Sequence, residues 1–276
     1  SSNYAEDLRI DHSILDQHAD SYRKIRNTFR YLLGNLNDNF EKIDLEKINI
    51  NNLPELEQLM LHKIHSLNTN YKNYFKKYDF HNLYKELLNF CTVELSAFYF
   101  DIRKDTLYCD PINSNKRKST ITLLNIILNS LMKWFAPILS FTTEEIFRLI
   151  SEDNKSIHLE KFLEFPENFN NEKLNQKWFE LIKIRNICNI SIEEKRASKE
   201  IGSSLEAKLH INLDKKLSDI TQNIDFSELC ITSSAEVIYS EKLETSVQTT
   251  KAEGSKCSVC WKITSSACSR KTCPIT

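Results

Sequence analysis

Apolar residues recur at three- and four-residue steps through most of this chain, which predicts a series of amphipathic helices. The first should run from about residue 13 to Asn37. Its apolar stripe consists of Tyr22, Ile25, Phe29, Leu32, Leu33 and Leu36. Similar stripes predict a second helix beginning around Pro54, a third from roughly 71 to 99, and a fourth from about 116 to 135.

The fourth predicted helix ends where Pro137 interrupts the backbone hydrogen bonding. Thr142-Thr-Glu-Glu145 then has the pattern of a capping box, in which the first threonine and the last glutamate bond each other's backbone. This box predicts a short helix that continues to Ile150. Long amphipathic helices joined by short polar connections pack most simply as an up-down bundle.

The pattern changes after Phe165-Pro166. A helix is expected from about 172 to 199, followed by strands at 208–213 and 235–240 with another helix between them. These elements predict a small α/β domain after the bundle. The expected division is 12–166 for the helical domain, 167–245 for the helix and α/β domain, and 246–276 for the C-terminal segment.

Composition supports a mainly α fold, because only three glycines and five prolines interrupt 276 residues. The N-terminal residues are polar and acidic, unlike a signal peptide. The sequence contains no run of about eighteen apolar residues, the length needed to span a bilayer. We therefore expect a soluble, cytoplasmic protein without a membrane partner. The net charge of −1 excludes a uniformly basic nucleic-acid binder, so any such binding must depend on local patches.

Three basic clusters could form such patches. Arg23, Lys24, Arg26 and Arg30 belong to the first, Lys72, Lys76 and Lys77 to the second, and Lys116, Arg117 and Lys118 to the third. The alternative for each cluster is an ordinary solvated helix face. His62 and His65 lie one helical turn apart and are expected at the surface.

Four of the eight cysteines lie in the last twenty residues: Cys257, Cys260, Cys268 and Cys273. A Cys-x2-Cys pair followed by two further cysteines is typical of a tetrahedral thiolate zinc site. The gaps of two, seven and four residues are compact but irregular. Disulfides and a redox motif are alternatives. The other cysteines are scattered, which favours buried thiols in a reducing compartment: Cys91, Cys109, Cys188 and Cys230.

Five segments, in this order along the chain, resemble the C-terminal third of isoleucyl-tRNA synthetases, which are class I aminoacyl-tRNA synthetases. They are Tyr22–Leu36, Phe98–Asp110, the APILSFT-type turn at Ala136–Glu145, the IGSSLEA segment at Ile201–Ala207, and the KCSVCW segment at Lys256–Trp261. The resemblance implies a helical bundle of the class Ia anticodon-binding type, a small α/β junction domain and a terminal zinc knuckle.

The chain departs from that family in having no HIGH-type tetrapeptide, no KMSKS-type loop and no Gly-rich phosphate loop. The resemblance therefore implies a fragment without catalytic residues, in which residues 1–11 continue from an upstream catalytic core. ATP would bind only in that core. One structural Zn²⁺ is expected on the four C-terminal cysteines.

The partner implied by the resemblance is an isoleucine-specific tRNA, bound by a monomer. Phosphates would be contacted by arginine and lysine, and unstacked bases by aromatic and polar side chains. The phosphate candidates are Arg23, Arg26, Arg30, Lys116 and Arg117. The base candidates are Asn27, Trp261, Lys262 and Arg270. Asn27 could instead be a plain surface amide, and Trp261 a hydrophobic plug beneath the zinc site.

Two other hypotheses belong to different functional classes. One is a stand-alone RNA-binding module with this architecture, and the other is a helical interaction scaffold that carries a structural zinc. Salt-dependent binding of tRNA separates the scaffold from both RNA-binding hypotheses.

Overall fold

The structure is a computed structural model that describes residues 3–4, 6–7, 10–36, 40–41, 43–151, 155–241 and 244–265. It is mainly helical with a small sheet, as the sequence predicts. The chain forms two compact units. The first unit comprises Ser1–Arg103 with Asn113–Asn171, and the second comprises Lys104–Ile112 with Glu172–Thr276.

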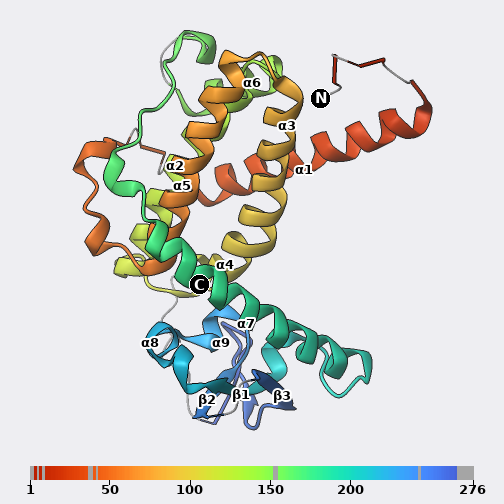
Figure 1. Ribbon diagram of the computed structural model, residues 1–276, viewed down its shortest axis with the longest axis vertical. Coiled ribbons are helices and arrows are strands. Elements are labelled where there is room, and N and C mark those ends of the chain that lie inside the picture. The colour runs from red at the N-terminus through yellow and green to blue at the C-terminus, as the bar shows by residue number, and fades with distance from the viewer. Residues whose placement is uncertain are drawn as a thin grey trace. The chain divides into compact units, whose positions relative to one another are not determined.

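The first unit is built from helices that pack side by side (Figure 1). Its elements are α1 (His12–Leu36), η2 (Leu45–Lys47), η3 (Ile50–Asn52), α2 (Glu55–Lys76), α3 (Phe80–Asn89), η4 (Phe90–Phe100), the start of α4 (Asp101–Cys109), α5 (Asn115–Phe135), α6 (Ser140–Ile150), η5 (Ile157–Leu159) and η6 (Glu167–Phe169). The apolar stripe of α1 is buried at Ile25, Phe29 and Leu32, as expected. Phe29 packs edge-on against Phe135 of α5, with ring centroids 6.1 Å apart.

The boundary predicted between the second and third helices is wrong. α2 continues without a break to Lys76, because Tyr71 extends its buried face and is only 1% exposed. The break comes at Tyr78, whose φ of 57° is left-handed, and the Asp79 side chain then caps α3 by accepting from the Asn82 amide at 3.2 Å. An aspartate cap was therefore the available sequence signal.

An unusual π-helix, η4, spans Phe90–Phe100 and joins α3 to α4. Within it the Ser96 hydroxyl donates to the Cys91 carbonyl five residues earlier, at 2.7 Å. π-helices are rare and mostly limited to one turn. Apolar periodicity does not distinguish this wider winding from an α-helix, so the sequence predicted only a continuous helix here.

The capping box predicted at the start of α6 is not formed. The helix begins earlier, at Ser140, and its N-cap residue Leu139 makes no side-chain cap bond. Thr143 bonds the carbonyl of Leu139 at 3.2 Å, and Ser140 bonds the carbonyl of Ala136 at 3.1 Å. Tertiary contacts use the two outer members of the expected box, Thr142 and Glu145, as described below.

The second unit contains a long helix, a three-stranded sheet and a small two-stranded sheet. Its elements are α7 (Glu172–Ala197), η7 (Ser204–Glu206), β1 (Ala207–Asp214), η8 (Lys215–Leu217), α8 (Ser218–Thr221), α9 (Phe226–Leu229), β2 (Ser234–Ser240), β3 (Ser246–Lys251), β4 (Ser255–Lys256) and β5 (Ile263–Thr264). Both predicted strands are confirmed, as β1 and β2. β3 was not predicted, because it is polar and only six residues long.

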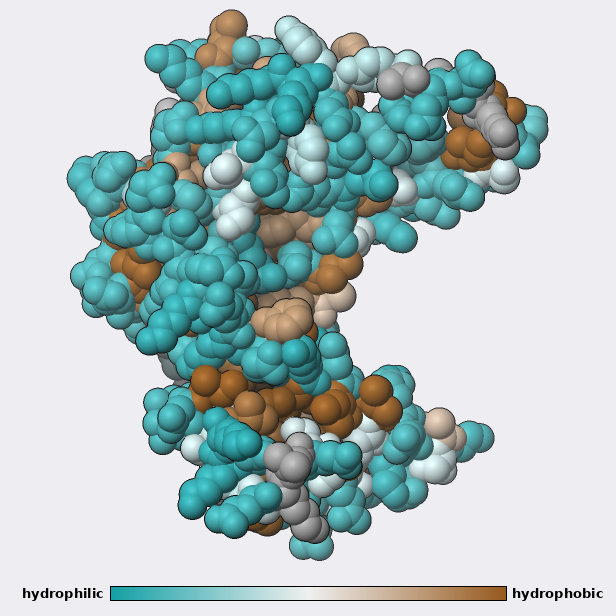
Figure 2. Space-filling model, viewed as in Figure 1, coloured by the Kyte–Doolittle hydropathy of each residue, from teal (hydrophilic) through white to brown (hydrophobic). Residues whose placement is uncertain are grey.

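The larger sheet has the order β2-β1-β3. β1 pairs in parallel with β2, where Leu209 faces Ala235, and antiparallel with β3, where Leu209 faces Thr249. α7 covers this sheet, and its Ser191 hydroxyl lies 2.8 Å from that of Thr249. Apolar side chains also face outward from α7, where Figure 2 shows hydrophobic residues gathered; Phe179 is 61% exposed and Ile190 is 62% exposed.

Two expectations about single residues have different outcomes. Burial is confirmed for the scattered cysteines, each of which is a free thiol: Cys91, Cys109, Cys188 and Cys230. The expectation that His62 lies at the surface is wrong, since it is 4% exposed and its Nδ1 accepts from the Asn171 amide at 3.0 Å.

No helix within the described ranges is both long and apolar enough to cross a membrane.

Candidate nucleic-acid interface

One face of α1 carries four of the residues predicted to contact RNA. Arg23, Arg26, Asn27 and Arg30 are separated by three, one and three residues, and all four are exposed. Residues three, four and seven positions apart lie on the same side of a helix. The local helical pattern alone therefore brings these side chains together.

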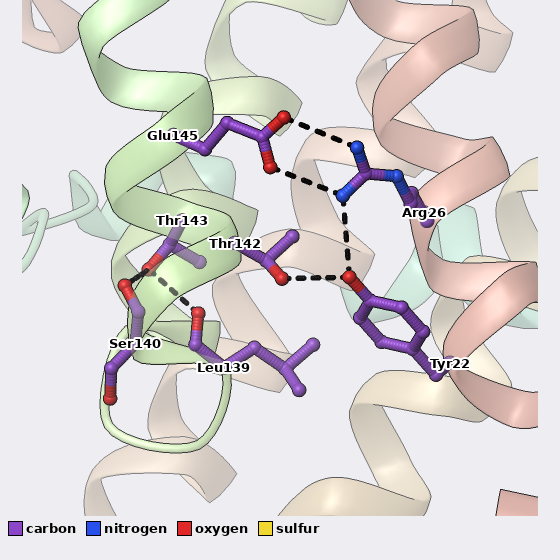
Figure 3. A network of polar contacts seen from close by, with 7 residues as sticks. All are labelled: Tyr22, Arg26, Leu139, Ser140, Thr142, Thr143 and Glu145. Carbon is purple, nitrogen blue, oxygen red and sulfur yellow. Dashed lines mark hydrogen bonds and ion pairs between the residues drawn. The ribbon is translucent and has the colours of Figure 1, made fainter. Parts of the chain in front are cut away.

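Arg26 is tied to α6 by a two-point ion pair (Figure 3). Its two terminal nitrogens donate to the two carboxylate oxygens of Glu145, each at 3.2 Å. One of these nitrogens also lies 3.3 Å from the Tyr22 hydroxyl, which in turn lies 3.0 Å from the Thr142 hydroxyl. The hydrogen bonds that Arg26 donates to Glu145 raise the pKa of the Arg26 guanidinium. The pKa of the Tyr22 hydroxyl is lowered, chiefly by its hydrogen bond with Thr142, although partial desolvation acts in the opposite direction.

These contacts fix α1 and α6 side by side, running in the same direction. They also neutralise the charge of Arg26, because both terminal nitrogens of its guanidinium are paired with carboxylate oxygens. The pair is about half exposed, with side-chain exposures of 50% and 54%. Arg26 therefore joins α1 to α6, and its charge is already used by Glu145 and less available to a phosphate.

Next to this pair lies a groove of about 490 Å³ between α1 and α6. Phe29, Leu33 and Ile146 give it an apolar floor, while Asn27 and Arg30 line it with polar groups. Gly34 completes the α1 side. A concave apolar surface with a few convergent polar groups is the usual form of a small-molecule or nucleobase site, and pockets of 300–1,000 Å³ are typical.

The polar residues of this face differ in how far they are already engaged. Arg23 is paired with Asp20 at 2.6 Å, within α1 itself. Asn27 and Arg30 have no hydrogen-bond or ion-pair partner among the residues that the structure describes. They are the groups on this face that remain available for a ligand.

Lys116 and Arg117 lie elsewhere on the first unit. Both belong to the first turn of α5, where the Ser114 hydroxyl accepts from the Arg117 amide at 3.2 Å. The α1 face lies beside the other end of α5, as the contact between Phe29 and Phe135 shows. A separation of 19 residues along a helix is about 28 Å at the α-helical rise. The structure thus divides the predicted phosphate contacts between two regions.

In the second unit, Cys257 and Cys260 form a tight turn between β4 and β5. The Cys257 amide donates to the Lys262 carbonyl at 2.9 Å, and the Val259 amide points to the Cys257 sulfur at 3.4 Å. An N–H directed at a cysteine sulfur suits a thiolate, the form that binds metal. Cys268, Cys273 and Arg270 lie outside the described residues.

Trp261 follows this turn and is 61% exposed, which does not fit the interpretation of a buried plug. Its φ of 63° is left-handed. The Lys256 ammonium lies 5.6 Å from the centre of the indole ring. Lys262, the next candidate, is partly exposed. An exposed indole beside a lysine is a suitable surface on which a base can stack.

No sequence pattern indicated that Cys109 would lie near the turn. Cys109, Cys257 and Cys260 form a buried cluster with Val259 packed against it, and the Cys109 thiol donates to the Val259 carbonyl at 3.8 Å. Within the described ranges, no three His, Cys, Asp or Glu side chains are arranged to hold a metal ion. The Cys257 and Cys260 thiols with the amide at Val259 fit half of a four-thiolate zinc site.

Comparison with known proteins identifies the family. Residues 57–211, more than half of the chain, match the family model described as the anticodon-binding domain of tRNA ligase. The chain therefore belongs to this family of tRNA ligase anticodon-binding domains.

The curated relatives are more particular. The chain is 72% identical to the isoleucine–tRNA ligase of Pelagibacter ubique over 270 residues, which are 98% of this chain and 30% of that protein. It is 39% identical to the isoleucine–tRNA ligase of Agrobacterium fabrum, over 95% of this chain and 28% of that protein. It is 37% identical to the isoleucine–tRNA ligase of Bartonella henselae, over 99% of this chain and 29% of that protein. The chain thus spans less than a third of the length of these relatives.

Proposed function

We propose that this chain is the anticodon-end tRNA-binding part of an isoleucine–tRNA ligase. The observation that carries the proposal is the α1 face, where Asn27 and Arg30 are not engaged by any described residue and lie beside an apolar groove in a domain of the anticodon-binding family. The isoleucine–tRNA ligase relatives support isoleucine tRNA as the particular partner. The chain acts as a monomer in the cytoplasm.

Recognition in this proposal uses two kinds of contact. Arg30 neutralises a backbone phosphate near the α1 face, and Arg23 does so by exchanging its exposed partner Asp20 for a phosphate. Lys116 and Arg117 contact phosphates farther along the tRNA. Asn27 offers both donors and an acceptor to a base edge. Trp261 supplies a stacking surface in the second unit, with Lys262 and Arg270 near it in sequence. Phosphate contacts position the RNA, and base contacts provide the specificity.

In this proposal the catalytic reaction is carried out by the complete enzyme and not by this chain alone. The complete ligase attaches isoleucine to its tRNA with ATP, and this chain contributes no catalytic residue. It carries neither an HIGH-type nor a KMSKS-type sequence. Its contribution is to hold the anticodon end of the tRNA.

The C-terminal segment binds one structural Zn²⁺ through Cys257, Cys260, Cys268 and Cys273. The turn at Cys257 supports this, because its sulfur already accepts from the Val259 amide. Structural zinc contributes on the order of 10 kcal/mol or more to the folding of small zinc modules. The metal would therefore supply most of the stability of this segment.

Equilibrium filter binding of the 276-residue chain to isoleucine tRNA, and to a tRNA of another specificity, tests the proposal. Isoleucine tRNA should bind more tightly, and its affinity should fall steeply between 50 and 200 mM salt. Arg30→Gln should reduce the slope of log affinity against log salt by roughly 0.7 to 0.9, the contribution of one phosphate. Lys47→Gln, which removes an exposed charge away from the groove, is the matched control.

Weak, salt-insensitive association with tRNA would contradict any anticodon role. Salt-dependent binding without preference for isoleucine tRNA would instead favour a general RNA-binding module. Either result is distinct from a loss of folding, which circular dichroism of the same samples would detect.

A further inference from the structure

Gly34 is one of only three glycines in the chain, and it lies inside a helix. A Cβ built at this position would have no neighbouring atom within 4 Å, and the backbone is helical. Neither close packing nor a left-handed conformation therefore requires glycine here. Glycine in a helix costs about 0.5 to 1 kcal/mol relative to alanine.

Gly254 provides a contrast within the same chain. Its φ is +130°, and a Cβ there would collide with the backbone oxygen of Thr264. Glycine is needed at that position for a local structural reason. Gly34 has no such reason, and the consequence of its missing side chain is open space on the α1 side of the groove.

The groove has the features that an unstacked nucleotide needs. Its floor is apolar at Phe29 and Ile146, so the face of a base can be buried against it. Asn27 can pair with a base edge and Arg30 with the adjoining phosphate. The one carboxylate in the wall, Glu145, is matched by Arg26, so the groove does not present an unpaired negative charge to RNA.

We propose that the α1–α6 groove binds one unstacked base of a single-stranded RNA loop, and that Gly34 keeps the groove open for that base. This inference rests on the proposed tRNA-binding function and names the site of one base contact. The exposed Leu149, on the α6 side, borders the same space and is 69% exposed. A base seated over Leu33 and Ile146 would cover part of this apolar surface.

Substitution of Gly34 by glutamine tests the inference directly, because the longer side chain fills the groove and suits a helix. We expect Gly34→Gln to bind the anticodon stem–loop of isoleucine tRNA about tenfold or more weakly, the size of one lost base contact. Its thermal stability should not fall. The matched control is Ala19→Gln, which adds the same side chain at an exposed α1 position outside the groove and should bind like the wild type.

A second variant does not depend on filling the groove. Asn27→Ala removes an exposed amide, so it should fold normally and weaken stem–loop binding by about fivefold or more. The same RNA stem closed as a blunt duplex without the loop serves as the second probe. Binding of this duplex should be unchanged in both Gly34→Gln and Asn27→Ala.

The outcomes separate this inference from the function on which it rests. Wild-type chain that binds neither probe would contradict the proposed function itself. Wild-type binding that persists unchanged in Gly34→Gln and Asn27→Ala would overturn the groove inference alone. Equal weakening of stem–loop and duplex would also overturn it, because it would indicate a general phosphate contact. A change in oligomeric state on sedimentation of Gly34→Gln would assign the groove to a protein contact instead.

Discussion

The guanidinium of Arg103 donates to both carboxylate oxygens of Glu57, each at 2.6 Å, in the core of the first unit. Both side chains are buried, with exposures of 4% and 0%. The Tyr99 hydroxyl donates to the same carboxylate at 3.0 Å, and Thr120 lies 3.3 Å from it. These groups come from α2, η4, α4 and α5, so the network joins four segments of the bundle.

Loss of one partner should leave a buried charge without compensation. We expect Arg103→Met to lower the free energy of unfolding of the first unit by about 3 to 5 kcal/mol. Chemical denaturation followed by circular dichroism measures this change. Lys47→Met, which breaks an exposed pair with Asp44, is the control and should leave the unfolding midpoint nearly unchanged.

The double variant Glu57→Met with Arg103→Met sharpens this test. Because it removes both charges, it should be more stable than Arg103→Met alone. A double variant that is less stable than the single would show that the network stabilises the bundle through packing more than through charge.

Gly34→Ala should raise the free energy of unfolding of the first unit by about 0.5 to 1 kcal/mol, because alanine favours the helix and its Cβ meets no other atom. The reverse change at an exposed position of α1, Ala19→Gly, should lower it by a similar amount. Thermal or urea unfolding measures both. A destabilised Gly34→Ala would mean that the space at this position is needed for the fold.

Burial raises the pKa of the Cys91 thiol to about 12, because the thiolate would be desolvated. An acid whose pKa is raised on folding stabilises the folded state below its unfolded pKa near 9, and this stability is lost as pH rises above that value. Between pH 8 and pH 10, ionisation of Cys91 should therefore lower the free energy of unfolding of the first unit by about 1.4 kcal/mol.

Cys91→Ala provides the comparison for this pH effect. The variant loses packing at every pH, but its stability should fall less steeply than that of the wild type between pH 8 and pH 10. Parallel curves for the two proteins would contradict the assignment of this alkaline loss to Cys91.

Removal of zinc should act on the C-terminal segment alone. We expect one zinc per chain in reduced, purified protein and none in Cys257→Ala. A chelator should unfold the last thirty residues and leave the helical bundle intact. Trp261 reports the change, because it lies in this segment with the Lys256 ammonium 5.6 Å from its ring, while Trp134 and Trp178 are buried in α5 and α7.

Cys109→Ala is the matched control for the metal. Its thiol touches the turn through Val259, but the proposed ligand set does not include it. This variant should keep one zinc per chain. Loss of zinc in Cys109→Ala, with zinc kept in a variant of Cys268 or Cys273, would show that Cys109 is a ligand in place of one of them.

Much of the helical organisation could be predicted from local patterns. The stripe of α1 placed its buried face correctly, and Pro137 marked the end of α5. Those features depend on residues a few positions apart, whose spacing the sequence states directly. The α2–α3 break was misplaced because no glycine or proline marks it, and the winding of η4 leaves no periodic signal.

The candidate site shows the same division. The sequence placed Arg23, Arg26, Asn27 and Arg30 together, since helical spacing is local. It could not show that Arg26 is neutralised by Glu145, 119 residues away, and it assigned that glutamate to a helix cap. The local capping box competed with a tertiary ion pair, and the ion pair prevailed.

The sequence by itself determined the helical class of this protein, the face of α1 on which the candidate RNA contacts lie together, and the paired cysteines of the C-terminal turn. Only the tertiary structure decided which of those groups are available to a ligand, which thiol lies against the cysteine turn, and where a groove opens beside Gly34. The reason is physical. Helical periodicity acts over a few residues, whereas charge neutralisation and open space depend on what distant segments bring to the same place.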